Sequence, residues 1–174
     1  MNQVLQKIKT RRSVRAFKSD MLPNEILEQI IEAGTYAASG RNRQPSIIIS
    51  VTDKQTIQKL TRVNAQIMGA PDADPFYGAP VVLIVLAQKG VNTYLYDGSL
   101  VMGNLMLAAH SLGVSSCWIH RARETFELPE WKEWLSGLGI EGEYEGIGHV
   151  ALGSAAGEYP DVLPRKEGRV FYVR

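Results

Sequence analysis

The sequence predicts an α+β fold, in which helices flank one central, mixed and mostly antiparallel sheet. Short apolar runs of strand length, such as residues 47–49 and 80–86, alternate with longer stretches whose apolar residues recur at the helical period. The second of these runs is apolar on both faces, as a central strand is. No linker, internal repeat or low-complexity segment divides the 174 residues, so a single domain over residues 1–174 accounts for the chain.

The first part of the chain is predicted to contain a helix, a basic loop, a second helix, a strand and a third helix. Apolar residues mark a short first helix over residues 4–10. Pro23 opens the second helix, because the first turn of a helix does not use the N–H that proline lacks, and Gly40 ends it. Residues 47–49 form a buried strand, and Asp53 belongs to the cap of the third helix.

The remaining elements follow from the same patterns. They are a loop at residues 69–77, the central strand at 80–86, a long helix over 93–112, a strand at 114–119, an amphipathic helix near 129–135, a strand near 148–152 and an alternating terminal strand at 169–173.

The long helix over residues 93–112 is apolar around nearly its whole circumference between residues 100 and 109. Such a helix must be buried on every side, which one sheet and its neighbouring helices rarely achieve in a small domain. Gly103 and Ala108 permit another helix to approach closely. We therefore expect a homodimer with this helix at the interface; the alternative is a helix buried entirely within a monomer.

Composition excludes several classes of protein. The formal net charge of +1 provides no bulk field that would recruit nucleic acid or an anionic membrane. A single cysteine, Cys117, rules out a disulfide framework and a cysteine-based zinc site. The N-terminus has no apolar core of signal-peptide length, and the longest apolar run is too short to span a bilayer. The expectation is a soluble, cytoplasmic protein without nucleic-acid or membrane partners.

Basic residues gather at the two ends of the chain. They are Lys7, Lys9, Arg11, Arg12, Arg15 and Lys18 at the first end, and Arg165, Lys166, Arg169 and Arg174 at the other. Guanidinium groups bind phosphate bidentately, so the two clusters would form an anion site if folding brought them together. A basic surface loop, or a nucleic-acid contact with steep salt dependence, is the alternative.

Motifs that supply a catalytic side chain are absent from the sequence. It contains no phosphate-binding P-loop, no dinucleotide fingerprint, no paired histidines at metal-ligand spacing and no serine in a nucleophile elbow. If the chain is an enzyme, its reactive group is therefore borrowed from a cofactor, which the protein orients and surrounds with charge.

Several motifs, in the correct order and over nearly the full chain, resemble the nitroreductase family of FMN-dependent NAD(P)H oxidoreductases, specifically its short members. These motifs are residues 11–17 (RRSVRAF), 37–45 (AASGRNRQP), 76–80 (FYGAP), 97–98 (DG) with 104–109 (NLMLAA), 113–119 (GVSSCWI), 148–153 (GHVALG) and 165–170 (RKEGRV). The resemblance implies the three-layer fold of that family and a dimer with the cofactor between its two subunits.

The resemblance also implies roles for the basic loop. Arg11 and Ser13, with Arg12 beside them, resemble the residues that hold the phosphate and ribityl chain of FMN. Arg15 resembles a cation placed near N1 and O2 of the isoalloxazine ring. A fixed guanidinium there stabilises the negative charge that reduction places on the ring.

The other implied cofactor-binding residues come from the rest of the chain. They are Ser39, Gly40, Asn42 and Gln44 in a loop donated by the second subunit, Trp118, Ile119 and His120 along the flavin ring, and Gly153, Lys166 and Arg169 at the phosphate. Asn64 is a further candidate, as the amide that reaches the pyrimidine edge. His120 and Arg121 stand where related chains often have acidic or glycine residues. They would either favour an anionic substrate or simply lie on the surface.

What the resemblance implies chemically is a ping-pong cycle from NADH or NADPH, through flavin N5, to a nitroaromatic, quinone or related small organic acceptor. No catalytic side chain is needed, because the flavin carries the chemistry. The alternative is other flavin chemistry on the same fold, namely dehalogenation, dehydrogenation of a peptide azoline or breakdown of the flavin.

Overall fold

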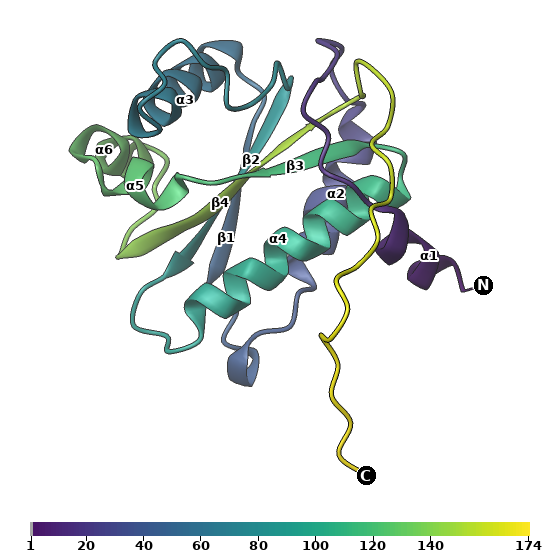
Figure 1. The fold of residues 1–174 in the computed structure, drawn as a ribbon. Coiled ribbons are helices and arrows are strands. Elements are labelled where there is room, and N and C mark those ends of the chain that lie inside the picture. The colour runs from purple at the N-terminus through teal and green to yellow at the C-terminus, as the bar shows by residue number, and fades with distance from the viewer. Residues whose placement is uncertain (1) are drawn as a thin grey trace.

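The computed structural model describes residues 2–174, and it has three layers: helices, a four-stranded sheet and helices again (Figure 1). Met1, the first residue of the predicted domain, lies outside the described residues. The elements in chain order are α1 (Gln3–Thr10), α2 (Asn24–Thr35), the 3-10 helix η1 (Gly40–Asn42), β1 (Ser46–Val51), α3 (Lys54–Ile67), β2 (Val81–Gln88), α4 (Tyr94–Ser111), β3 (Ser115–Ile119), α5 (Ala122–Glu127), α6 (Pro129–Gly137) and β4 (Tyr144–Gly153).

The sheet has the strand order β1-β2-β4-β3, and every pair of named strands is antiparallel. Strand β2 is central, as its continuous apolar run predicts. Its side chains alternate between two cores: Val82, Ile84 and Leu86 pack on the side of α3, α5 and α6. Val81, Leu83, Val85 and Ala87 pack on the side of α2 and α4. This alternation confirms the predicted α+β architecture, because each face of the sheet has its own helical layer.

Local chemistry explains several boundaries. The Asp53 side chain accepts a hydrogen bond from the backbone N–H of Thr56 (2.7 Å) and so caps α3. The peptide N–H of Val4 donates to the side chain of Asn2 (2.9 Å), which caps α1. Pro129 occupies the first turn of α6, where its missing N–H costs nothing.

Four expectations from the sequence need correction. Helix α2 ends at Thr35, and Gly40 instead begins η1, because the chain must turn there towards β1. Helix α5 is too short to show a periodic pattern and was not predicted. Strand β4 starts at Tyr144, earlier than expected, because Tyr144, Glu145 and Gly146 also pair with β2. Residues 169–173 form no strand within the chain, because no strand of the same chain pairs with them.

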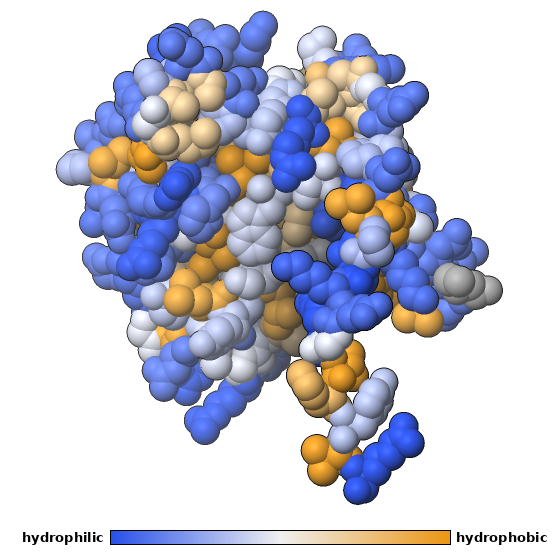
Figure 2. Space-filling view, in the orientation of Figure 1, coloured by the Kyte–Doolittle hydropathy of each residue, from blue (hydrophilic) through white to orange (hydrophobic). Residues whose placement is uncertain are grey.

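Two helices have apolar faces that the described chain leaves uncovered. On α4, Leu100 is 50% exposed and Gly103 has open space around it, although Met102 and Leu105 are fully buried. Helix α1 buries no residue at all. The tail beyond residue 161 runs away from the body and carries apolar side chains into solvent (Figure 2). The burial of the long helix on every side is thus not achieved within one chain.

Among residues 2–174 no helix combines the length and apolar character needed to cross a membrane.

Candidate functional site

The basic loop, here residues 11–18, lies between the start of β3 and the chain that leaves β4. Ser13 forms a parallel bridge with Ser116, and the N–H of Val14 donates to the carbonyl of Ser116 (3.1 Å). On the other side, the N–H of Lys18 donates to the carbonyl of Ser154 (2.9 Å). The structure therefore brings together three separate motifs: residues 11–17, 113–119 and 148–153.

A glycine is required where these segments meet. A Cβ atom at Gly153 would lie 2.8 Å from the Cδ atom of Pro80 and 3.2 Å from the Cδ1 atom of Phe17. Both distances are too short for ordinary packing. Gly153 therefore allows Pro80 and Phe17 to approach the end of β4 closely.

Two polar side-chain atoms in this cluster are buried without a hydrogen-bond partner among the described residues: Nη1 of Arg11 and Oγ of Ser116. An unmet donor such as the buried Nη1 atom of the half-buried Arg11 is costly, since it has lost water and gained no other partner. A phosphate placed there would supply acceptor oxygens to both groups. The donor set at Arg11, Ser13 and Ser116 therefore fits the phosphate end of FMN.

Arg12 has a different environment from the one expected. Its guanidinium donates to the carbonyls of Asp161 (Nε, 3.2 Å) and Lys9 (Nη2, 2.9 Å), and to the carbonyl of Arg11. These bonds occupy Arg12 in tying the basic loop to α1 and to the chain after β4. The structure thus places Arg12 as a support of the loop beside Arg11 and Ser13.

Arg15 is exposed, and its charge acts on Cys117 of β3. Burial raises the pKa of the Cys117 thiol, and the charges of Arg15 and Arg11 offset this only in part. The thiol is therefore protonated and buried at neutral pH, which suits a structural residue and not a redox nucleophile.

The loop over residues 39–44 is held in a strained conformation at the other end of the molecule. Arg41, Asn42 and Gln44 all have positive φ angles (54°, 54° and 48°), which residues other than glycine rarely adopt. The N–H of Gly40 donates to Oδ1 of Asp97 on α4 (3.0 Å), and Asp97 is 5% exposed. Clustered backbone strain of this kind persists where function requires it, so it favours a functional role for the loop.

The two parts of the predicted site do not meet within one chain. Asp97, which holds the loop over residues 39–44, lies near the N-terminal end of α4, whereas the basic loop lies beside His110 near the C-terminal end. Asp97 and His110 are thirteen positions apart along α4, which corresponds to about 20 Å at the helical rise per residue. Figure 1 shows η1 and α1 near opposite ends of α4.

The residues expected along the flavin ring lie on and just after β3. Trp118 and Ile119 continue the strand from Ser116, and Ile119 pairs with His149 of β4. His120 is exposed at the end of the strand. Arg121 has a positive φ of 77°, and its Nη1 atom lies 2.8 Å from Oε1 of Glu124, so its charge is already paired.

Three predicted site residues are not brought to the cluster. Asn64 is fully buried: its Nδ2 donates to the carbonyl of Leu60 (2.9 Å) and to Oγ1 of Thr125 (3.3 Å), and so it joins α3 to α5. Its Oδ1 is buried without a hydrogen-bond partner among the described residues, so Asn64 lies within the core between α3 and α5. Lys166 and Arg169 are exposed on the tail, beyond the last hydrogen bond that ties the chain to the basic loop, at Asp161.

Sequence reasoning missed three residues that support the site. Asp97 could have been found in the sequence, because it is an acid within an otherwise apolar helix. A buried acid of this kind needs hydrogen-bond donors, and here the N–H of Gly40 is one of them. Ser116 lies between Ser115 and Cys117 and carried no distinctive signal. Tyr159, whose hydroxyl accepts the N–H of Arg12 (2.7 Å), lies 147 residues away in the sequence, and only folding reveals the contact.

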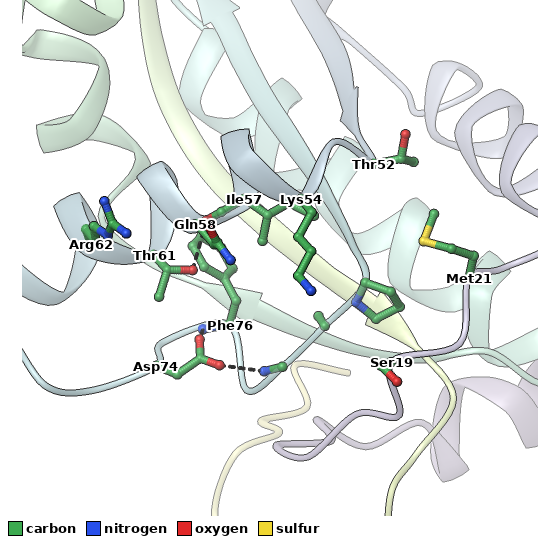
Figure 3. A pocket seen from close by; sticks show the side chains of 13 residues that line it. Ser19, Met21, Thr52, Lys54, Ile57, Gln58, Thr61, Arg62, Asp74 and Phe76 are labelled. Atoms are coloured by element: carbon green, nitrogen blue, oxygen red, sulfur yellow. Dashed lines mark hydrogen bonds between the residues drawn. The ribbon is translucent and has the colours of Figure 1, made fainter.

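A separate pocket of about 520 Å³ lies between α3 and the turn at residues 74–80. Figure 3 shows Lys54 extending from α3 towards it, with Ile57 of the same helix beside Lys54 and Phe76 on the facing segment. The carboxylate of Asp74 is occupied by the N–H groups of Phe76 (2.9 Å) and Gly78 (2.7 Å). None of the predicted cofactor-binding residues lines this pocket.

The model of the nitroreductase family matches residues 8–154, so the chain belongs to this family. A putative NADH dehydrogenase/NAD(P)H nitroreductase of Methanothermobacter thermautotrophicus is 30% identical over 140 residues, which cover 73% of this chain and 70% of the relative. The FMN reductase [NAD(P)H] of Bacillus subtilis is 30% identical over 169 residues, covering 80% and 66% of the two chains. The crystal structure of a nitroreductase with bound FMN from Bacteroides fragilis superposes with a TM-score of 0.91 at 30% identity, over 100% of both chains.

Proposed function

We propose that this chain is an FMN-dependent oxidoreductase that passes electrons from NADH or NADPH to nitroaromatic, quinone or related small organic acceptors. The observation that carries the proposal is the pair of buried polar atoms without a partner, Arg11 Nη1 and Ser116 Oγ, beside the hydroxyl-bearing Ser13. Further support comes from the bound FMN of the similar Bacteroides fragilis structure and the NAD(P)H in the names of the curated relatives.

The chain's own residues bind and orient the cofactor. Arg11 and Ser13 would hold the phosphate, while the backbone of Trp118 and Ile119 would run along the ring. Arg15 would present a positive charge to the ring edge that becomes negative on reduction. When bound, FMN supplies the redox chemistry at N5, in a ping-pong cycle that needs no catalytic side chain.

The proposal includes a homodimer, because the two parts of the site lie about 20 Å apart in one chain. Two copies of α4 packed antiparallel would place the loop over residues 39–44 of one subunit near the basic loop of the other. The exposed strip around Leu100 and Gly103 provides a suitable contact face, since Gly103 leaves open space for a close helix approach. Each site would then contain residues of both subunits.

The test is the flavin content and turnover of the purified protein. We expect yellow protein that releases FMN on denaturation and oxidises NADH or NADPH with menadione or nitrofurazone, with parallel lines in double-reciprocal plots. Yellow protein without nicotinamide turnover would favour the other flavin chemistries. Colourless protein that binds DNA or RNA with steep salt dependence would contradict the proposal.

Arg11→Ala tests the phosphate site directly. A hydrogen bond from a charged group is worth about 1.5–3 kcal/mol, so the FMN dissociation constant should rise about 10-fold to 150-fold. Arg62→Ala is the matched control, because Arg62 is an exposed arginine on α3 outside the cofactor cluster. Equal FMN affinity for the two variants would count against the assignment of Arg11.

A further inference from the structure

Three segments of the chain meet at the C-terminal end of α4, around the side chain of His110. Nε2 of His110 lies 2.9 Å from Oγ1 of Thr10, and Nδ1 lies 3.2 Å from the hydroxyl oxygen of Tyr159. The Tyr159 hydroxyl also accepts the peptide N–H of Arg12 (2.7 Å). The rings of His110 and Tyr159 stack, with centroids 5.7 Å apart and an angle of 17° between their planes. We call these four residues the His110 cluster.

The hydrogen bonds in the His110 cluster have a single consistent direction. The hydroxyl of Thr10 donates its one hydrogen to the carbonyl of Gln6 (2.9 Å), so towards His110 it can only accept. The proton of the neutral His110 ring therefore lies on Nε2, and Nδ1 accepts the hydroxyl hydrogen of Tyr159. This leaves the oxygen of Tyr159 free to accept the N–H of Arg12. Every polar group of the His110 cluster therefore has a hydrogen-bond partner when His110 is neutral.

The surroundings of His110 favour the neutral ring. Lys7 of α1 donates from Nζ to the carbonyl of His110 (3.3 Å), and Arg11 and Arg12 of the basic loop add two more positive charges. Tyr159 is the titratable group that faces the ring from the segment after β4. Within residues 2–174, the salt bridges involve Arg121 and Arg123 at the other end of β3, so no acid pairs with this cluster. Partial burial, followed by Lys7, Arg11 and Arg12, lowers the pKa of His110.

The atom that the cluster fixes is the peptide nitrogen between two proposed phosphate ligands. Arg12 N follows Arg11 directly and precedes Ser13, and the Tyr159 hydroxyl is its hydrogen-bond acceptor. Asp161, two residues after Tyr159, accepts from the guanidinium of the same arginine (3.2 Å). Residues 159–161 therefore hold both the backbone and the side chain of Arg12, and Figure 1 shows this segment crossing the N-terminal part of the chain near α1.

We propose that neutral His110 is a positioning residue which, through the hydroxyl of Tyr159, fixes the backbone at Arg12 and so presents Arg11 and Ser13 to the phosphate of FMN. The inference rests on the proposed function for the identity of the ligand. Protonated His110 can no longer accept the Tyr159 hydroxyl hydrogen, and its Nδ1–H becomes a second donor that competes with the Arg12 N–H for the Tyr159 oxygen. Acidification should therefore loosen residues 159–161 and weaken FMN binding.

The first test is Tyr159→Phe, which keeps the ring that stacks on His110 and removes the hydroxyl. In the full-length protein at pH 7.5, the FMN dissociation constant should rise about fivefold to tenfold, the equivalent of one hydrogen bond. Tyr36→Phe is the matched control, because Tyr36 is 79% exposed, and it should stay within about twofold of wild type. A thermal melt within a few degrees of wild type shows that Tyr159→Phe remains folded.

The second test separates His110 from the titration of the FMN phosphate. His110→Gln keeps a neutral donor and acceptor, so its FMN affinity at pH 7.5 should stay within about threefold of wild type. Between pH 7.5 and pH 5, wild type should lose at least about threefold more FMN affinity than His110→Gln, because the phosphate titration is common to both. Equal losses would overturn the role of His110.

A readout in the apo protein distinguishes this proposal from the proposed function. Hydrogen exchange at the Arg12 amide should be slow in wild type and faster in Tyr159→Phe, whether or not FMN is present. Unchanged exchange at Arg12, or equal FMN affinity of Tyr159→Phe and wild type, overturns the role of the His110 cluster alone. Failure of the wild-type protein to bind FMN overturns the proposed function, and with it this role.

Discussion

His149 leads to a quantitative prediction about acid stability. It lies in β4 with no solvent exposure, between the ring of Phe76 (centroids 5.3 Å apart, planes at 88°) and the ring of Phe126 (6.1 Å, 38°). Neither ring nitrogen has a hydrogen-bond partner of normal geometry, although the backbone of Ile119 and His120 lies close. Burial is the main cause that lowers the pKa of His149 to about 4.

The sign and size of the effect follow from proton linkage. In the unfolded chain a histidine titrates at a pKa of about 6.5, so between that pH and about 4 the unfolded state binds a proton that the folded state rejects. The free energy of unfolding therefore falls as the pH is lowered through this window. Each pH unit within this window is worth about 1.4 kcal/mol. His149 therefore lowers the free energy of unfolding by about 2 kcal/mol between pH 7.5 and pH 5.

The assay is urea unfolding of the apo protein at pH 7.5 and pH 5, at one fixed protein concentration because a dimer is expected. His149→Leu removes the titrating ring, so wild type should lose about 2 kcal/mol more than this variant between the two pH values. Contributions from other groups, including His110, are common to both proteins and cancel. Equal losses for wild type and His149→Leu would refute the reasoning.

Three further substitutions test other parts of the structure. Asn64→Ala should destabilise the protein by about 1–3 kcal/mol in urea unfolding, because it removes the hydrogen bonds to Leu60 and Thr125. The FMN dissociation constant should stay unchanged. A loss of FMN affinity without a loss of stability would contradict the structural role of Asn64. Gly146→Ala should cost about 3 kcal/mol or more, because its Cβ would lie 2.2 Å from the backbone of Ala122, whereas Gly137→Ala, with open space around it, should shift the midpoint little. Leu100→Glu should convert the dimer to a folded monomer in sedimentation experiments, while the control Leu138→Glu, at an equally exposed leucine on the other helical layer, should remain dimeric; a dimeric Leu100→Glu protein would place the interface elsewhere.

Particular residues show why some parts of the fold were predictable. The run at residues 80–86 is apolar on both faces, and it forms the central strand β2 with a core on each side. Asp53 caps α3 as expected, because capping depends on residues three positions apart. Strand β4 was predicted too short, since Gly146 and Gly148 suggest a turn when read in isolation. Close packing explains why these positions are glycines: a Cβ atom at Gly148 would lie 2.6 Å from the ring of Trp118.

The candidate site divides in the same way. The motifs at residues 11–17, 113–119 and 148–153 were predicted to belong together, and the structure places them side by side. Asn64 was a candidate, from the resemblance, for the amide at the pyrimidine edge of the flavin, but its Nδ2 bonds Thr125 because α3 packs that side of the helix against α5. Lys166 and Arg169 are positively charged, like the arginines of the basic loop, but they lie on the exposed tail.

The sequence by itself determined the class of fold, most of the helices and strands, and the family, because these depend on residue types and on spacings of a few positions along one chain. Only the tertiary structure decided which groups share an environment. The proton on Nε2 of His110, the acceptor for the N–H of Arg12 and the buried partnerless Nη1 of Arg11 all depend on contacts between segments far apart in the sequence. Such contacts leave no periodic trace, since a single hydrogen bond between distant residues imposes no repeating pattern on either segment.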